Sequence, residues 1–104
     1  MSDKFDKVSV AKKANVFFDG KCVSHSVFFP DGSRRTVGVI LPGTLTFNVG
    51  TPELMEITSG TCRVKIGDEA DFTTYAAGSQ FSVPANGKFV IEANEVVNYV
   101  CSFG

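Results

Sequence analysis

Hydrophobic and polar residues alternate with a period of two along most of this chain. The pattern is carried by segments 22–29, 36–41, 44–49, 62–66, 89–93 and 97–103. Strict alternation is typical of β-strands that bury one face and expose the other. We therefore expect short strands throughout the chain, with at most one short helix.

Short turn signals separate these segments. They are Asp31-Gly32, Pro42-Gly43, Ser59-Gly60, Gly67-Asp68, Ala77-Gly78 and Asn86-Gly87, with a weaker signal at Asn94-Glu95. Many short strands at such intervals indicate a sandwich or barrel rather than a parallel sheet covered by helices. Ten phenylalanines and no tryptophan fit a barrel lined with aromatic side chains. We expect an all-β fold.

Two of the β-type runs have the spacing of known barrel motifs. Glu53 lies seven positions before Gly60, and Gly78 lies six positions before Pro84. This is the frame of the two sequence motifs of the cupins, so the chain resembles a single cupin-type β-barrel, or jelly roll. We assign the barrel to residues 16–104, after an N-terminal extension of residues 1–15 that is flexible or forms a short turn.

The metal-binding histidines of the cupin motifs are absent. The chain has one histidine, His25, which lies outside both frames. A cupin metal centre requires about three imidazoles and a carboxylate. The sequence therefore predicts no metal site, and His25, which alternates with valines, is expected to be structural.

Composition narrows the class of protein further. A chain of 104 residues is one domain, and its net charge of −1 argues against a nucleic-acid-binding face. No run approaches the roughly 20 apolar residues of a membrane-spanning helix, and no signal peptide is evident. Cys22, Cys62 and Cys101 have no metal-type spacing, so we expect buried reduced thiols and a cytoplasmic location.

Several runs together carry a resemblance to one family. They are residues 18–24, 36–43, 45–47, 52–55, 59–60, 75–78, 81–86 and 99–101. In order and spacing they resemble the pyrimidine/purine nucleoside phosphorylases, small cupins without the usual metal, from about Val16 to the C-terminus. The chain departs from that family at Leu45, Phe72 and Gly87-Lys88, where a tyrosine, a tryptophan and a serine-containing turn are common.

The resemblance implies phosphorolysis of purine and pyrimidine ribonucleosides. Inorganic phosphate, as co-substrate, would replace the base at C1′ and release free base and pentose 1-phosphate, with no other cofactor. The resemblance also implies a homodimer. Two other functions remain open: a non-catalytic cupin that binds a sugar or nucleoside, and a metal-free isomerase of a sugar phosphate.

Phosphorolysis requires specific chemical groups. Breaking a glycosidic bond builds positive charge on the ribose, which a carboxylate can stabilise. Phosphate requires a charged donor, preferably a guanidinium that binds two oxygens. Glu53 is the candidate for ribose. Arg34 is the candidate for phosphate, with the Thr36 hydroxyl beside it; the resemblance favours Arg34 over Arg35, and Arg63 is expected to point outward.

Other candidates would bind the substrate. Phe47 and Phe81 project from predicted strands and could stack on the base. Ser79 and Gln80 follow a turn and could form hydrogen bonds with the ligand. Tyr99 carries a polar tip on an apolar run and could contact either the core or the ligand.

Overall fold

The computed structural model describes residues 4–103, and strands dominate that range. The strands are β1 (Ser9–Val10), β2 (Asn15–Phe17), β3 (Cys22–Phe28), β4 (Arg34–Ile40), β5 (Gly43–Asn48), β6 (Glu53–Ser59), β7 (Thr61–Ile66), β8 (Thr73–Ala76), β9 (Gln80–Val83), β10 (Lys88–Ala93) and β11 (Val97–Phe103). One 3-10 turn, η1 (Phe18–Gly20), follows β2. The prediction of an all-β fold is confirmed.

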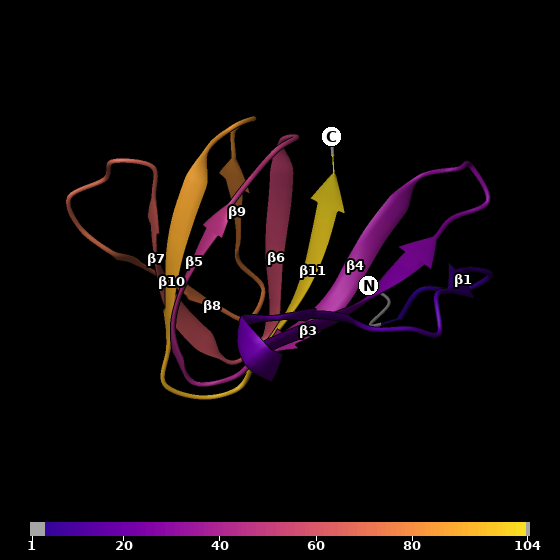
Figure 1. Ribbon diagram of the computed structural model, residues 1–104, viewed down its shortest axis with the longest axis horizontal. Coiled ribbons are helices and arrows are strands. Elements are labelled where there is room, and N and C mark those ends of the chain that lie inside the picture. Colours follow the sequence, from indigo (N-terminus) through magenta and orange to yellow (C-terminus); the bar gives the residue numbers. More distant parts are fainter. Residues whose placement is uncertain (1–3, 104) are drawn as a thin grey trace.

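The described strands form two antiparallel sheets (Figure 1). The larger sheet has the order β1-β3-β4-β11-β6-β9, and β2 also pairs with β3. The smaller sheet has the order β5-β10-β7-β8. The chain passes between the sheets several times, so strands distant in sequence lie side by side, and β11, the last strand, lies between β4 and β6.

One hydrophobic cluster packs between the sheets. Its largest fully buried side chains are Phe89, Ile40, Ile57, Ile91, Val64, Val83, Val97 and Cys22. The Phe81 ring of the larger sheet lies 5.5 Å, centroid to centroid, from the Phe89 ring of the smaller sheet. Full burial of a side chain of this size stabilises a fold by about 1.5–3 kcal/mol, so this shared core holds the two sheets together.

The N-terminal segment is partly tied to the larger sheet. Ser9 and Val10 pair with Phe28 and Val27 of β3, whereas a flexible segment or a turn was expected for residues 1–15. The reason is local: β3 would otherwise be an edge strand with unpaired backbone groups. The first three residues of that extension lie outside the described residues.

No helix among residues 4–103 is long and apolar enough to span a bilayer.

The three cysteines are buried and form no disulfide. His25 is also structural in its contacts, since its Nδ1 lies 3.1 Å from the Ala11 carbonyl oxygen. That contact links β3 to the segment that follows β1.

Candidate active site

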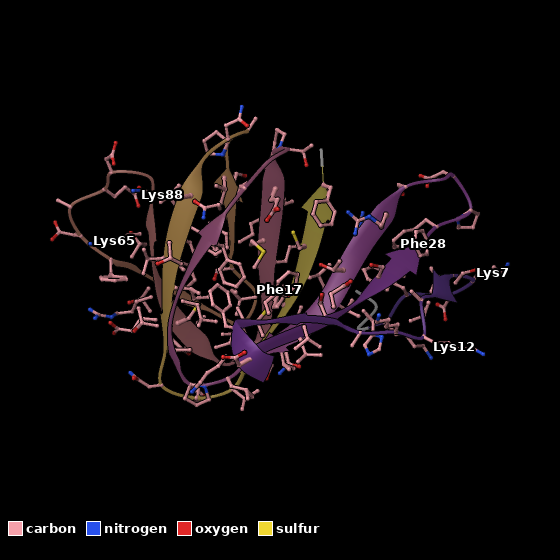
Figure 2. The ribbon with its side chains drawn as sticks, in the orientation of Figure 1. Lys7, Lys12, Phe17, Phe28, Lys65 and Lys88 are labelled. Carbon is pink, nitrogen blue, oxygen red and sulfur yellow. The ribbon has the colours of Figure 1, made fainter. Side chains whose placement is uncertain are left out.

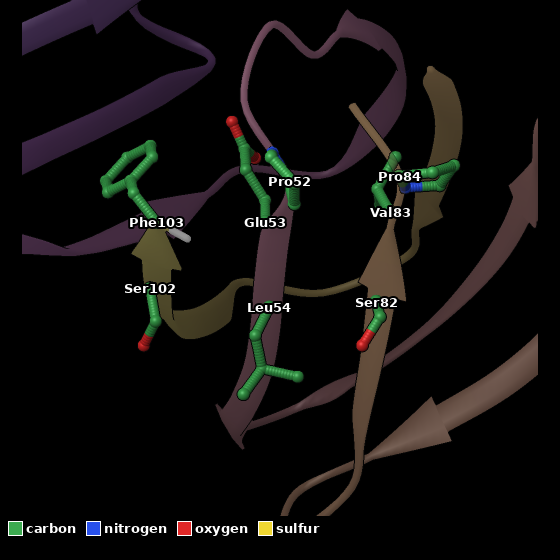
Figure 3. Close-up of a pocket in the computed structure, with 8 residues that line it drawn as sticks. All are labelled: Pro52, Glu53, Leu54, Ser82, Val83, Pro84, Ser102 and Phe103. Carbon is green, nitrogen blue, oxygen red and sulfur yellow. The ribbon is translucent and has the colours of Figure 1, made fainter. Parts of the chain in front are cut away.

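A cavity of about 290 Å³ lies between the two sheets. Its lining residues are Asn15, Phe17, Ser24, Arg34, Thr36, Phe47, Asn48, Glu53, Met55, Phe89, Tyr99, Cys101 and Phe103. A more open depression of about 410 Å³ at the ends of β6, β9 and β11 shares Glu53 and Phe103 with it (Figure 3). The two spaces therefore meet at these residues.

Three neighbouring strands of the larger sheet form the charged wall of the cavity. Phe103 of β11 is the cross-strand partner of Glu53 of β6, and the two side chains lie next to each other at the strand ends (Figure 3). On the other side of β11, the Arg34 guanidinium carbon lies 4.2 Å from the centre of the Phe103 ring. Arg34 is the one cation among the lining residues.

The Glu53 carboxylate accepts a hydrogen bond from a thiol of the neighbouring strand β11. Cys101 Sγ donates a hydrogen bond to Glu53 Oε1 over 3.4 Å. Burial, followed by the nearby carboxylate, raises the pKa of Cys101 to about 12. The thiol therefore stays protonated near neutral pH and remains a donor.

Burial raises the pKa of Glu53 above its ordinary value, although the Cys101 hydrogen bond and the Arg34 charge both act to lower it. A carboxyl group whose ionised form is disfavoured by its surroundings gains from a cationic partner. A substrate that develops positive charge beside Glu53 would be such a partner.

Polar groups continue into the floor of the cavity. The Tyr99 hydroxyl lies 3.4 Å from Cys22 Sγ, and burial raises the pKa of Tyr99, so the phenol is neutral. Asn15 Nδ2 donates to the hydroxyl oxygens of Ser24 and Ser26, each over 3.3 Å. The hydroxyl groups that line the cavity thus lie on the larger sheet, whereas the amides come from both sheets, Asn15 on β2 and Asn48 on β5.

The opposite wall is aromatic and belongs to the smaller sheet. Phe47 and Phe89 stack with centroids 5.0 Å apart and an interplanar angle of 15°. Phe18 packs edge-on against Phe47 at 5.1 Å. Phe17 projects over the space between the sheets, whereas the labelled lysines lie at the periphery (Figure 2).

The segment around η1, next to the cavity-lining residue Phe17, has unusual backbone geometry. Phe18 and Asp19 have φ angles of 54° and 55°. Left-handed geometry is uncommon for a bulky residue such as phenylalanine and costs roughly 1–2 kcal/mol. Its result is that Phe17 lines the cavity while Phe18 packs on the outer edge of the aromatic wall.

The structure brings five of the eight candidate residues together. Arg34, Thr36, Phe47, Glu53 and Tyr99 all line the cavity. Successive residues of a strand face opposite sides of the sheet, so Arg34 and Arg35 point in opposite directions. Arg35 stacks over Phe5 and Phe29, outside the cavity. Arg63 pairs with Glu92 over 2.6 Å, also outside it.

The remaining three candidates lie elsewhere. The Ser79 hydroxyl donates to the Ala76 carbonyl within a turn, and Gln80 is exposed on β9. Phe81 is 5% exposed and packs between Tyr75 and Phe89 in the core. None of the three lines the cavity, because β9 is the edge strand on the far side of β6.

Sequence reasoning missed Phe103 and Cys101 as site residues. The alternation of segment 97–103 contained the signal, since Tyr99, Cys101 and Phe103 fall on one face. Asn15 gave no signal, because it reaches the site through the pairing of β2 with β3.

No cluster of three or more histidine, cysteine or acidic side chains suited to a metal ion occurs within residues 4–103. The cavity wall offers one carboxylate, one thiol and no imidazole. This donor set differs from that of a metal-dependent cupin.

Solved structures identify the class of the fold. An oxalate decarboxylase from Bacillus subtilis matches with a TM-score of 0.73 and 15% identity, over 99% of this chain and 30% of that one. A protein of unknown function from Acinetobacter sp. ADP1 matches with a TM-score of 0.97 and 51% identity, over 99% of this chain and 100% of that one. The protein is an all-β domain with cupin-like structural neighbours.

The sequence comparisons give the family. Residues 12–103 match the family model described as pyrimidine/purine nucleoside phosphorylase. A pyrimidine/purine nucleoside phosphorylase from Cupriavidus necator is 62% identical over 100 residues, which cover 96% of this chain and 95% of that protein. The chain belongs to the pyrimidine/purine nucleoside phosphorylase family.

Proposed function

We propose that this protein is a nucleoside phosphorylase that cleaves purine and pyrimidine ribonucleosides with inorganic phosphate. One observation carries the proposal: a single cavity holds a guanidinium, a carboxylate and a stacked aromatic wall. The names of the relatives support it, since they describe the same activity.

The reaction assigns a role to each wall. A phosphate oxygen attacks C1′ of the ribose as the bond between C1′ and the base nitrogen breaks, and the bonding electrons leave with the base. Arg34 binds the phosphate through two guanidinium donors. Glu53, as the carboxylate, stabilises the positive charge on the ribose ring. Both groups lie at the same end of the cavity, so attack and charge stabilisation occur together.

Other lining residues orient the nucleoside. The Phe47 ring offers a stacking surface for the base, and Thr36 and Tyr99 supply hydroxyl groups to the sugar and phosphate. Partial exclusion of water by the aromatic wall protects the sugar from hydrolysis. The site uses no metal and no cofactor beyond phosphate.

We further propose a cupin-type barrel that works as a cytoplasmic homodimer in nucleoside salvage. Support for association comes from the outer face of the larger sheet, where alternation directs Val37, Val39, Leu54 and Val100 away from the cavity. These side chains are partly buried. A second copy packed there would cover them.

The decisive experiment measures free base. Uridine or inosine is incubated with the protein, with and without inorganic phosphate, and the base is quantified by chromatography. We expect base and pentose 1-phosphate in equimolar amounts only when phosphate is present. Nucleoside binding without turnover would instead identify a non-catalytic binding protein, and turnover of sugar phosphates alone would identify an isomerase.

A further inference from the structure

Arg34 and Glu53 carry opposite charges on the same cavity wall, yet no ion pair joins them in the described part of the chain, residues 4–103. They lie on β4 and β6, on either side of β11. The residue that β11 presents between them is Phe103. Its backbone is in register with Glu53, and its ring lies 4.2 Å from the Arg34 guanidinium carbon.

Direct pairing would be the favourable alternative in the absence of ligand. Glu53 is partly buried whereas Arg34 is exposed, and opposite charges attract more strongly where one of them is partly withdrawn from water than where both are fully solvated. A guanidinium also fits a carboxylate through two parallel hydrogen bonds. Such a pair would occupy the donors that phosphate needs and the oxygens that face the ribose. A substrate would then have to break the pair before it could bind.

The ring of Phe103 provides another partner for the cation. An aromatic face attracts a guanidinium but does not bind the N–H groups that point outward in the plane of the guanidinium. Those N–H groups therefore stay available to a ligand. Cys101, two residues earlier on the same face of β11, binds the carboxylate from its own side. The strand thus holds each charge separately.

We propose that Phe103 is a positioning residue that keeps Arg34 and Glu53 apart, so that the guanidinium is free for phosphate and the carboxylate is free for ribose. The proposal rests on the proposed function for the identity of the two ligands. The separation itself is a property of the unliganded site and can be measured without turnover.

The kinetic test compares Phe103→Leu, which removes the ring but keeps apolar bulk, with Phe103→Trp, which keeps an aromatic face. We expect Phe103→Leu to raise the KM for phosphate by about 2- to 30-fold, the range of a cation–aromatic contact. The KM for nucleoside should change less, and Phe103→Trp should restore phosphate use. The Kd of inorganic phosphate, measured by calorimetry, should follow the KM.

Phe29→Leu is the matched control. It removes the ring that lies 5.1 Å from the Arg35 guanidinium carbon, outside the cavity, and should leave the KM for phosphate unchanged. A KM for phosphate that is the same in Phe103→Leu and in the wild type would overturn the proposal, provided that the thermal melts of the two proteins coincide. If Phe103→Leu melts earlier, the comparison of Phe103→Trp with wild type and the titration below decide.

The second test titrates Glu53 by carbon-detected nuclear magnetic resonance. If the ring separates the charges, Phe103→Leu lets Arg34 reach Glu53, and the pKa of that carboxyl falls. The fall should be much smaller when Arg34→Ala is also present. An equal fall in both backgrounds would mean that water entering the cavity is the cause, and would overturn the proposal.

The titration also separates the two claims. If the wild-type protein releases no base with phosphate, the proposed function fails. The titration of Phe103→Leu then tests by itself whether Phe103 keeps Arg34 and Glu53 apart. An Arg34-dependent fall in the Glu53 pKa supports that role, and an unchanged pKa refutes it.

Discussion

Cys101 and Glu53 are joined by a thiol-to-carboxylate hydrogen bond of 3.4 Å between the adjacent strands β11 and β6. The thiol is 4% exposed, and its pKa is raised to about 12, so it donates throughout the physiological range. This bond fixes one carboxylate oxygen and leaves the other for a ligand. It also acts to lower the pKa of Glu53 against the effect of burial.

Removing that donor should shift the pH profile. In Cys101→Ala the pKa of Glu53 rises further, because the hydrogen bond that favoured the ionised form is gone. We expect the acid limb of kcat/KM to move to higher pH, with a loss of about fivefold below neutrality, as for a hydrogen bond worth about 1 kcal/mol. Cys62→Ala is the control, since Cys62 is buried on β7 and does not line the cavity. Identical pH profiles for Cys101→Ala and wild type would contradict the assignment.

Arg34→Ala should remove most phosphate use while the fold is retained. Losing a charge-assisted contact of this kind costs on the order of 2–4 kcal/mol, or about 30- to 1,000-fold in rate at subsaturating phosphate. Arg63→Ala should have little effect, because Arg63 pairs with Glu92 away from the cavity. Initial rates at several phosphate concentrations give the measurement. If Arg35→Ala is the damaging change instead, the anion site lies on the other face of β4.

Glu53→Gln should abolish most activity and stabilise the fold at neutral pH. Because burial raises the pKa of Glu53, its ionised form disfavours the folded state. The penalty is absent at a pH below the ordinary glutamate pKa, where both states are protonated, and grows as pH rises through the raised value. Urea unfolding of both proteins from pH 3 to 8 should show the largest difference at the alkaline end. A difference that widens in acid would show that the sign is reversed.

Gly38→Ala should destabilise the larger sheet. A Cβ at this position would lie 2.5 Å from the Val23 carbonyl oxygen and 2.8 Å from Ser24 Cβ, closer than such atoms pack. Overpacking against a backbone costs about 1–3 kcal/mol. Gly50→Ala, where a Cβ would meet nothing within 4 Å, is the control. Equal midpoints of chemical denaturation for the two variants would refute the close approach.

Phosphorolysis should survive exhaustive chelation. The chain has a single histidine, whereas cupin metal centres use about three. Dialysis against EDTA should leave the rate of base release unchanged. A lost rate that a divalent metal restores would show that the site needs a metal ion.

The sequence was enough to predict the strands because each strand buries one face, and alternation is a local property. The turns were visible for the same reason: Gly32, Gly60, Gly67 and Gly78 all have positive φ angles, as their turn signals suggested. Strand pairing was not visible. It depends on contacts between distant segments, such as Cys101 with Met55 and Thr36, which no local pattern contains.

The candidate site was only partly accessible to the same reasoning. Arg34, Glu53 and Tyr99 followed from chemistry and from the family resemblance, and they line one cavity. Phe81 was chosen as a ring on a predicted strand and Gln80 as a polar residue after a turn, but β9 pairs with the far side of β6 and leaves both outside the cavity. Phe103 has no chemistry of its own, so its relation to Arg34 became clear only when β11 was seen between β4 and β6.

The division of the cavity between two sheets has an evolutionary consequence. The charged groups come from β4 and β6 and the hydroxyl groups from β3, β4 and β11, whereas the stacked rings come from β5 and β10. Substitutions in the two groups fall on different sheets, although both groups line one cavity, so their effects are expected to be coupled through it. Selection for a new nucleobase can act on Phe47 and its neighbours without replacing Arg34 or Glu53, which lie on the other sheet. Directed evolution of this scaffold should begin with the rings.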